Sequence, residues 1–137
     1  MSQKNVQIVR DLMALNERAR ESGELPSRAD LIAPELEIDM SRRVLNPAVY
    51  RGARGLAQLN HEIRDVWEQF HVVPERFVDA GDRVVVIETL HARGRGSGVE
   101  LDTRRSATIW TLRDGRVTRV QVGFEPQEAL QAVGLQE

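Results

Sequence analysis

Cysteine is absent from the 137 residues of this chain, and aromatic residues are few, at 4%. Without cysteine the chain can form no disulfide and offers no thiolate to a metal ion. Long hydrophobic runs are also missing, because the longest, Val84–Ile87, is far shorter than the ~20 apolar residues that span a bilayer. The N-terminal segment is polar and lacks the apolar core of a signal peptide, so we expect a cytoplasmic protein without a membrane partner.

Charge of neither sign is in large excess, since the formal net charge is -2. A slightly acidic chain lacks the positive footprint of a nucleic-acid-binding protein, and only the arginine-rich stretch 93–105 favours one. The eighteen arginines against one lysine are also explained by a nucleotide-composition bias in the gene. We expect no nucleic-acid partner. The length and the ordinary globular composition predict a single domain over residues 1–137.

Apolar residues in the first half of the chain recur mainly with helical spacing. They predict a long helix over Val6–Ala19 that ends near Gly23, and another from Leu56 to Phe70. Between these helices, the segment Ser27–Pro34 has the capping and breaking residues of a short helix. The alternation over Leu36–Met40 then predicts a half-buried strand.

The rest of the chain follows strand patterns, and 41–52 is predicted as a loop. Four strands are predicted over 72–78, 83–93, 99–112 and 116–124. Asp114-Gly115 indicates a hairpin turn in which both central residues take positive φ, and Glu125-Pro126 begins a last helix that Gly134 ends. This order predicts an α+β fold, with helices covering one side of an antiparallel sheet.

The same order resembles the SnoaL-like domains of the nuclear-transport-factor-two-like (ketosteroid isomerase-like) superfamily. The likeness lies in the opening helix IVRDLMALNERARESGEL, the strand LEIDM, Tyr50-Arg51-Gly52 before the third helix, and the meander that ends in VQVGF. It implies a cone-shaped, strongly curved antiparallel or mixed sheet wrapped around a long N-terminal helix, a cystatin-like α+β barrel. It also implies a pocket for a small apolar or polycyclic molecule, and a homodimer. Members include isomerases, cyclases, hydrolases and non-catalytic binding proteins.

Ketosteroid isomerases pair a base carboxylate with a tyrosine and a protonated aspartic acid. By the resemblance, Asp39 lies where that catalytic base would be. Asp11 and Thr108 stand near the positions of the two partners, so steroid isomerisation is not expected. Asp39 also has a simpler interpretation, because it lies on the polar face of its strand, opposite Ile38 and Met40. That alternation favours a solvated carboxylate.

Glu88 is the second candidate catalytic residue, because it interrupts the apolar run that ends at Ile87. It shares a strand face with Val84 and Val86. If this face lines the pocket, burial raises the pKa of the carboxyl group and suits it to proton transfer. A neighbour such as Arg104 would instead hold Glu88 ionised. If the other face points inward, Glu88 is solvated or lies at a dimer contact.

The candidate ligand-binding residues, besides Arg104, are Trp110, Thr108, Tyr50 and Trp67. By the resemblance, Trp110 and Thr108 share the face of their strand that lines the pocket. Trp67 either reaches the ligand or holds the third helix against the sheet, and core packing is the ordinary place for either tryptophan.

No cofactor and no metal are expected, because His61, His71 and His91 lack the spacing of metal ligands. The glycine-rich segment 94–98 is interpreted as a hairpin tip, since phosphate-binding loops open a helix and strands flank this one. Two functions stay open: an acid–base enzyme of the isomerase, cyclase or hydrolase kind, and a non-catalytic ligand-binding or dimerisation module.

Overall fold

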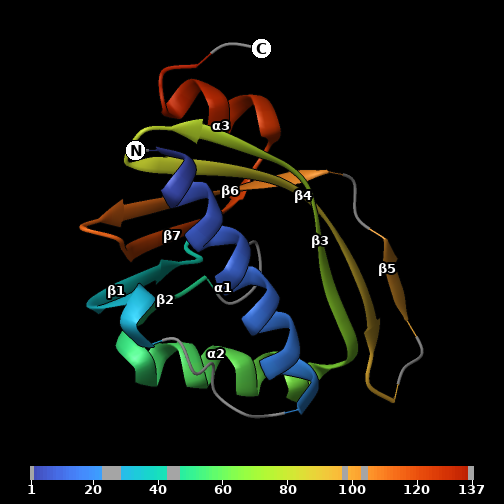
Figure 1. Cartoon of the computed structure of the whole chain (residues 1–137). Coiled ribbons are helices and arrows are strands. Elements are labelled where there is room, and N and C mark those ends of the chain that lie inside the picture. Colours follow the sequence, from blue (N-terminus) through green and yellow to red (C-terminus); the bar gives the residue numbers. More distant parts are fainter. Residues whose placement is uncertain (1, 23–28, 43–46, 97–98, 103–104, 136–137) are drawn as a thin grey trace.

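The computed structural model describes residues 2–22, 29–42, 47–96, 99–102 and 105–135 (Figure 1). It contains three α-helices, one 3-10 turn and seven strands. In chain order these elements are α1 (Ser2–Ser22), η1 (Ala29–Leu31), β1 (Ile32–Asp39), β2 (Val49–Arg51), α2 (Gly52–Val66), β3 (Trp67–Ala80), β4 (Arg83–Gly94), β5 (Glu100–Asp102), β6 (Ser106–Arg113), β7 (Arg116–Phe124) and α3 (Pro126–Ala132).

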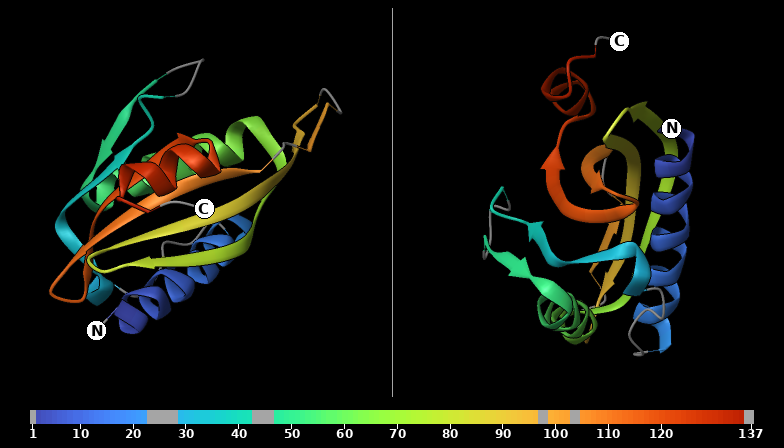
Figure 2. Two further views of the ribbon diagram at one scale, coloured as in Figure 1. Left: turned by 90° about the horizontal axis from the view of Figure 1, so that it is seen from above. Right: turned by 60° about the vertical axis from the view of Figure 1, so that its left-hand side comes forward.

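The strands form one mixed sheet that curves around α1 without closing (Figures 1 and 2). The strand order is β2-β1-β7-β6-β4-β3, and β5 pairs with the end of β4. β1 runs parallel to β7, whereas the other pairs are antiparallel. The long strand β3 has two register shifts, one of them at Pro74, and such bulges bend a strand and increase its twist. The predicted α+β class with a curved sheet around the first helix is confirmed.

The apolar run on β4 is buried from both sides of the sheet. Val84 and Val86 pack in a cluster with residues of α1 and α2, whereas Val85 and Ile87 pack in a second cluster with Leu130 of α3. α1 and α2 therefore cover the concave face, and α3 covers the opposite face (Figure 2). The expectation that the helices lie on one side is wrong, because an apolar run without alternation needs cover on both faces.

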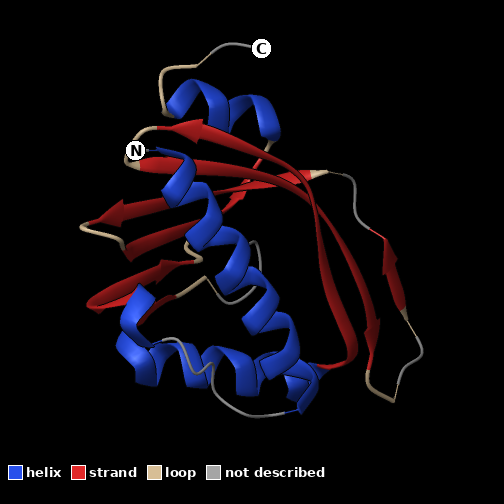
Figure 3. Ribbon diagram, in the orientation of Figure 1, coloured by secondary structure: helices blue, strands red, loops and turns tan. Residues whose placement is uncertain are grey.

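The helix predicted from Leu56 to Phe70 ends earlier than its apolar spacing indicates. α2 stops at Val66, and Trp67 and Phe70 belong to β3, which follows directly (Figure 3). In β3 these two residues pair with Gly94 and Ala92 of β4. Aromatic side chains favour strands, and the backbone of β4 supplies hydrogen bonds that the local pattern does not reveal.

Other boundaries also differ from the expected ones. The second helix is a single 3-10 turn, Ser27 lies outside the described residues, and Pro34 lies within β1. The expected loop 41–52 contains the short strand β2, and the expected strand 99–112 is divided into β5 and β6. β2 pairs with β1, and β5 pairs with β4, so both short strands depend on partners distant in the sequence.

The local signals at the C-terminal end are confirmed. Asp114 and Gly115 have φ values of 52° and 77°, as the hairpin turn requires. α3 begins with Pro126 in its first turn, and Glu125 and Glu128 cap it reciprocally. Among the described residues, no helix combines the length and the apolar character needed to cross a membrane. A cytoplasmic location stays a prediction.

Candidate functional site

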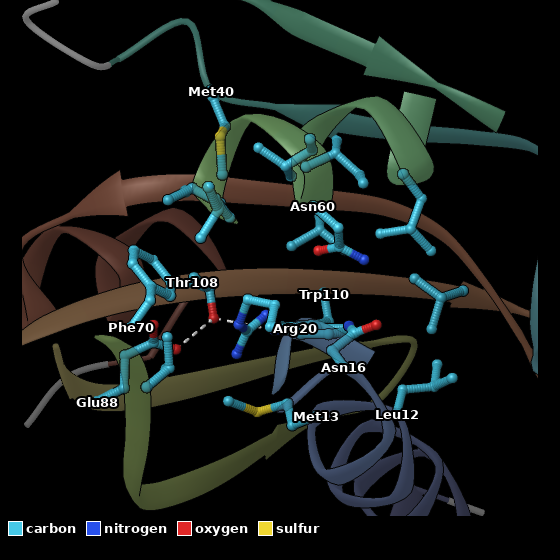
Figure 4. Close-up of a pocket in the computed structure, with 18 of the residues that line it drawn as sticks. Leu12, Met13, Asn16, Arg20, Met40, Asn60, Phe70, Glu88, Thr108 and Trp110 are labelled. Atoms are coloured by element: carbon cyan, nitrogen blue, oxygen red, sulfur yellow. Dashed lines mark hydrogen bonds between the residues drawn. The ribbon is translucent and has the colours of Figure 1, made fainter. Parts of the chain in front are cut away.

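A cavity of about 230 Å³ lies between α1, α2 and the concave face of the sheet (Figure 4). Most of its wall is aliphatic or aromatic, with Leu12, Leu59, Phe70 and Trp110 among the lining residues. The more polar lining side chains are Asn16, Arg20, Asn60, Glu88, Ser106 and Thr108. A largely apolar cavity with a few polar groups is the usual form of a small-molecule site.

Glu88 reaches this cavity from β4, and only 9% of it is exposed. Its position follows from the alternation on the strand, which puts it on the same face as Val84 and Val86. Burial raises the pKa of its carboxyl group to about 7, although a hydrogen bond from Thr108 and the positive charge of Arg20 each lower it in part. A carboxyl group with this pKa is suited to gain or lose a proton near neutral pH.

Two residues of β6 hold one oxygen of the Glu88 carboxyl group. Trp110 Nε1 donates to Thr108 Oγ1 over 2.9 Å, and Thr108 Oγ1 donates to Glu88 Oε1 over 3.2 Å (Figure 4). The direction is set by chemistry, because an indole N–H can only donate and the hydroxyl hydrogen is then left for the carboxyl group. Within the described part of the chain, Oε2 of Glu88 makes no hydrogen bond.

Three more polar side chains in the cavity wall each carry a buried atom that has no hydrogen-bond partner among the described residues. These atoms are Asn16 Oδ1, Arg20 Nε and Asn60 Nδ2. None of the three residues was a candidate from the sequence, yet a signal was present. Asn60 occupies a position of the buried face of α2 that also carries Leu56 and Leu59, where an apolar residue is expected.

Asp39 does not line the cavity, because it points to the opposite face of β1 from Leu36 and Ile38. Its Oδ1 accepts hydrogen bonds from the hydroxyl and the backbone N–H of Ser41, and its Oδ2 accepts one from Arg119. The two bonds from Ser41, and then the Arg119 guanidinium, hold the pKa of Asp39 below its ordinary value. Asp39 therefore lies on the polar face of its strand, outside the cavity, and its carboxylate is held by Ser41 and Arg119 rather than solvated.

The structure brings only some of the candidate ligand-binding residues to the cavity. Thr108 and Trp110 line the cavity. Tyr50 is buried in the core beside it, and its hydroxyl donates to Glu62 over 2.6 Å. Trp67, at the start of β3, does not line the cavity, although Phe70 of the same strand does. Arg104 lies outside the described residues.

One group of possible metal ligands comes together outside the cavity wall. Atoms of Glu17, Glu21 and His71 lie within 4.8 Å of one another, although β3 and α1 are distant in the sequence. His71 Nδ1 is 2.6 Å from Glu17 Oε1, and Arg20 Nη2 donates to Glu17 Oε2 over 2.8 Å. Because Glu17 already has two close partners, these contacts describe a half-exposed ion-pair cluster, and no metal is required to explain it.

The comparisons with known proteins all indicate the same family and fold. A model of the SnoaL-like domain matches residues 12–120. No curated protein matches the chain. Among solved structures, a putative SnoaL-like polyketide cyclase from Jannaschia sp. CCS1 is 20% identical, with a TM-score of 0.72 over 100% of this chain and 96% of that one.

Two further solved structures have the same fold. An NTF2-like protein from Burkholderia xenovorans LB400 is 24% identical over 98% of both chains, with a TM-score of 0.72. TerC, co-crystallised with polyporic acid, is 19% identical, with a TM-score of 0.69 over 95% of this chain and 98% of that one. At these identities the similarity establishes the fold, and function must be argued from the cavity.

Proposed function

The chain belongs to the SnoaL-like domain family, and from this premise we propose that it is a small-molecule enzyme in which Glu88 transfers a proton to and from an apolar substrate. The observation that carries the proposal is the Glu88 carboxyl group. It is buried in an apolar cavity, has a pKa raised to about 7, and keeps one oxygen without a hydrogen bond among the described residues. A general acid or base works best with a pKa near the operating pH.

The reaction that suits this arrangement is enolisation of a carbonyl compound. Oε2 of the ionised Glu88 takes a proton from a carbon next to the carbonyl group. The electron pair of that C–H bond forms the carbon–carbon double bond, and the carbonyl oxygen becomes the enolate oxygen. The protonated Glu88 then returns its proton to the same carbon or to another one, so no further reactant is needed.

Thr108 and Trp110 support this step as positioning residues. Because Thr108 donates to Oε1, the carboxyl group is held in one orientation and Oε2 is left to receive the proton. The same hydrogen bond stabilises the ionised form and keeps the pKa of Glu88 from rising further. Proton transfer in a low-dielectric cavity also gains from exclusion of water.

A proton-exchange experiment tests the proposal without knowledge of the natural substrate. 1-Tetralone is incubated with the protein in D₂O, and deuterium uptake next to the carbonyl group is followed by NMR. Deuterium is taken up when the proton on Glu88 exchanges with the solvent before it is returned to carbon. The wild type is expected to accelerate the exchange, and Glu88→Gln to slow it by roughly 100-fold. Asp39→Asn, which alters a carboxyl group outside the cavity, serves as the control. An exchange rate independent of Glu88 would overturn the proposal.

A non-catalytic ligand-binding module is the second candidate. It is favoured by the observation that, among the described residues of the cavity wall, Glu88 is the only carboxylic acid, since Asp39 points elsewhere. In this case a bound apolar molecule raises the free energy of unfolding but remains chemically unchanged. Turnover or deuterium exchange of a bound molecule would exclude this alternative.

We also propose that the chain forms a homodimer, as its resemblance to SnoaL-like domains implies. We expect two binding partners: a second copy of the chain and the small molecule in the cavity. Light scattering at micromolar concentration should give twice the mass of 15.5 kDa. A monomer under these conditions would contradict the dimer and leave the cavity chemistry unaffected.

A further inference from the structure

Ser106, the first residue of β6, is paired directly opposite Glu88 of β4. Directly opposed residues of an antiparallel pair project their side chains from the same face, with Cβ atoms about 4.5–5.5 Å apart. Both residues line the cavity. The cavity wall therefore carries a hydroxyl group next to the carboxyl group that we propose as the base.

A second hydroxyl group of β6 shows how close this strand comes to the carboxyl group. Thr108 pairs with Val86 and is only a diagonal neighbour of Glu88, yet its Oγ1 lies 3.2 Å from Glu88 Oε1 (Figure 4). Ser106 is nearer to Glu88 in the register of the two strands. Among the described residues, however, the hydroxyl group of Ser106 makes no hydrogen bond.

Most other hydrogen-bond donors of the cavity wall are unavailable to a ligand. Trp110 Nε1 donates to Thr108, and Thr108 donates to the carboxyl group. Arg20 Nε and Asn60 Nδ2 are buried and have almost no accessible surface, so they offer no hydrogen to a molecule in the cavity. Ser106 lines the cavity, is only half-buried, and keeps a hydroxyl hydrogen that it can donate.

The proposed enolisation needs a donor of this kind. When Glu88 takes a proton from carbon, negative charge moves to the carbonyl oxygen, and an apolar cavity stabilises that charge poorly. A donor fixed beside the oxygen lowers the barrier, because its hydrogen bond strengthens as the charge grows. The carbonyl oxygen is two bonds away from the carbon that loses the proton. The donor must therefore be close to the base, as a directly opposite residue is.

We infer that Ser106 is a further catalytic residue, whose hydroxyl group donates a hydrogen bond to the carbonyl oxygen of the substrate while Glu88 holds the proton. The inference rests on the proposed function and adds the group that stabilises the enolate. Ser106 keeps its own hydrogen throughout. When Glu88 returns the proton to carbon, the carbonyl group is restored and no further reactant is consumed.

Deuterium exchange of 1-tetralone in D₂O measures the contribution of Ser106. A cavity of roughly 150 Å³ holds one benzene molecule. At about 230 Å³, this cavity has room for the two rings of the probe. Ser106→Ala removes the hydroxyl group and should slow the exchange by about 100-fold. Thr111→Val, which removes a hydroxyl group of β6 outside the cavity, is the control and should exchange at the wild-type rate.

A binding measurement separates loss of the hydrogen bond from a change in the shape of the cavity. Tetralin has the two rings of 1-tetralone but no carbonyl group. In calorimetric titrations, Ser106→Ala should bind 1-tetralone about fivefold more weakly than the wild type and bind tetralin equally well. An equal loss of affinity for both probes would mean that Ser106 only shapes the cavity, and would overturn the inference.

A spectroscopic measurement detects the hydrogen bond without turnover. 1-Tetralone is labelled with ¹³C at the carbonyl carbon, whose resonance moves downfield when the oxygen accepts a hydrogen bond. The bound probe should show this shift in the wild type and in Glu88→Gln, and lose it in Ser106→Ala. A resonance in the wild type that matches 1-tetralone dissolved in cyclohexane would overturn the inference, and this comparison needs no variant to fold.

The outcomes separate this inference from the function on which it rests. Exchange that depends on Glu88 but not on Ser106 would overturn the inference and leave the proposed function standing. Loss of exchange in Asn16→Leu but not in Ser106→Ala would assign the donor to α1 and overturn the inference in the same way. Exchange that is independent of Glu88, or failure of 1-tetralone to bind, would overturn both.

Discussion

Thr108 donates a 3.2 Å hydrogen bond to Oε1 of Glu88 inside the cavity, and this contact opposes the effect of burial on the glutamic acid. Burial favours the neutral carboxylic acid, whereas a donated hydrogen bond favours the carboxylate. The two effects leave the pKa of Glu88 at about 7. The proposed proton transfer at neutral pH depends on this balance.

Replacing Thr108 by valine should raise the pKa of Glu88 above its present value. Valine keeps the shape of threonine but removes the hydroxyl group that stabilises the carboxylate. The pKa is read from the ¹³C chemical shift of the Glu88 carboxyl group during a pH titration. Thr111→Val is the matched control, because Thr111 is on the same strand but does not line the cavity. An unchanged or lower pKa in Thr108→Val would show that the hydrogen bond does not act on Glu88.

Glu88→Gln should change how stability depends on pH. The folded-state pKa of Glu88 is raised from 4.5 to about 7, so the wild type is fully stabilised below pH 4.5 and loses stability as the pH rises toward and through 7. Glutamine does not ionise. Relative to Glu88→Gln, the wild type should lose about 3 kcal/mol of unfolding free energy between pH 4 and pH 8.

Urea denaturation of both proteins across this pH range measures the difference. Glu35→Gln, at an exposed position of β1, is the control and should follow the wild type closely. If the wild type and Glu88→Gln keep a constant difference from pH 4 to pH 8, the carboxyl group is not buried in solution.

Asp39→Asn should weaken the fold slightly and leave binding in the cavity unchanged. Asp39 accepts from Ser41 and Arg119, and loss of its charge weakens these contacts by about 1 kcal/mol at neutral pH. Its folded-state pKa lies below the ordinary 3.8, so this stabilisation is present above that pH and is lost as the pH falls through the folded-state value. Urea denaturation at pH 7 and pH 2 checks the difference, and a loss of affinity for 1-tetralone would place Asp39 in the binding site after all.

Gly55→Ala should destabilise the protein, because α2 crosses very close to β2 at this residue. A Cβ atom on Gly55 would lie 2.8 Å from the carbonyl carbon of Tyr50. The helix would have to shift, at a cost of roughly 1–3 kcal/mol that exceeds the ~1 kcal/mol helix preference of alanine. Arg54→Ala, at the adjacent exposed position, is the control in urea denaturation. Because Leu56 and Leu59 of α2 line the cavity, the shift should also weaken binding of 1-tetralone.

The helices and turns that were predicted correctly depend on near neighbours in the chain. The spacing of Val9 and Leu12 on α1, the Asp114-Gly115 turn and the start of α3 at Pro126 are all local signals. The alternation that puts Asp39 outside and Glu88 on the face of Val84 is equally local. It did not decide between Asp39 and Glu88, and both stayed candidate catalytic residues until the structure was known.

The secondary-structure predictions are wrong where pairing with a strand distant in the sequence overrides the local pattern of apolar residues. Trp67 and Phe70 continue the helical spacing of α2, but pairing with β4 makes them a strand. β2 and β5 are too short to give a pattern of their own, and each forms only because β1 or β4 offers an open edge.

Amino-acid order accounts for the α+β class, for most elements and for the face of β4 on which Glu88 lies, because periodicity and turn chemistry act within a few residues. It leaves open which face of the sheet encloses the cavity, since that depends on how the curved sheet packs against α1 and α2. The joining of Asn16, Arg20 and Asn60 around one space is likewise decided by packing between helices far apart in the chain. The raised pKa of Glu88 follows from the same packing, because it comes from removal of water rather than from any neighbour in the sequence.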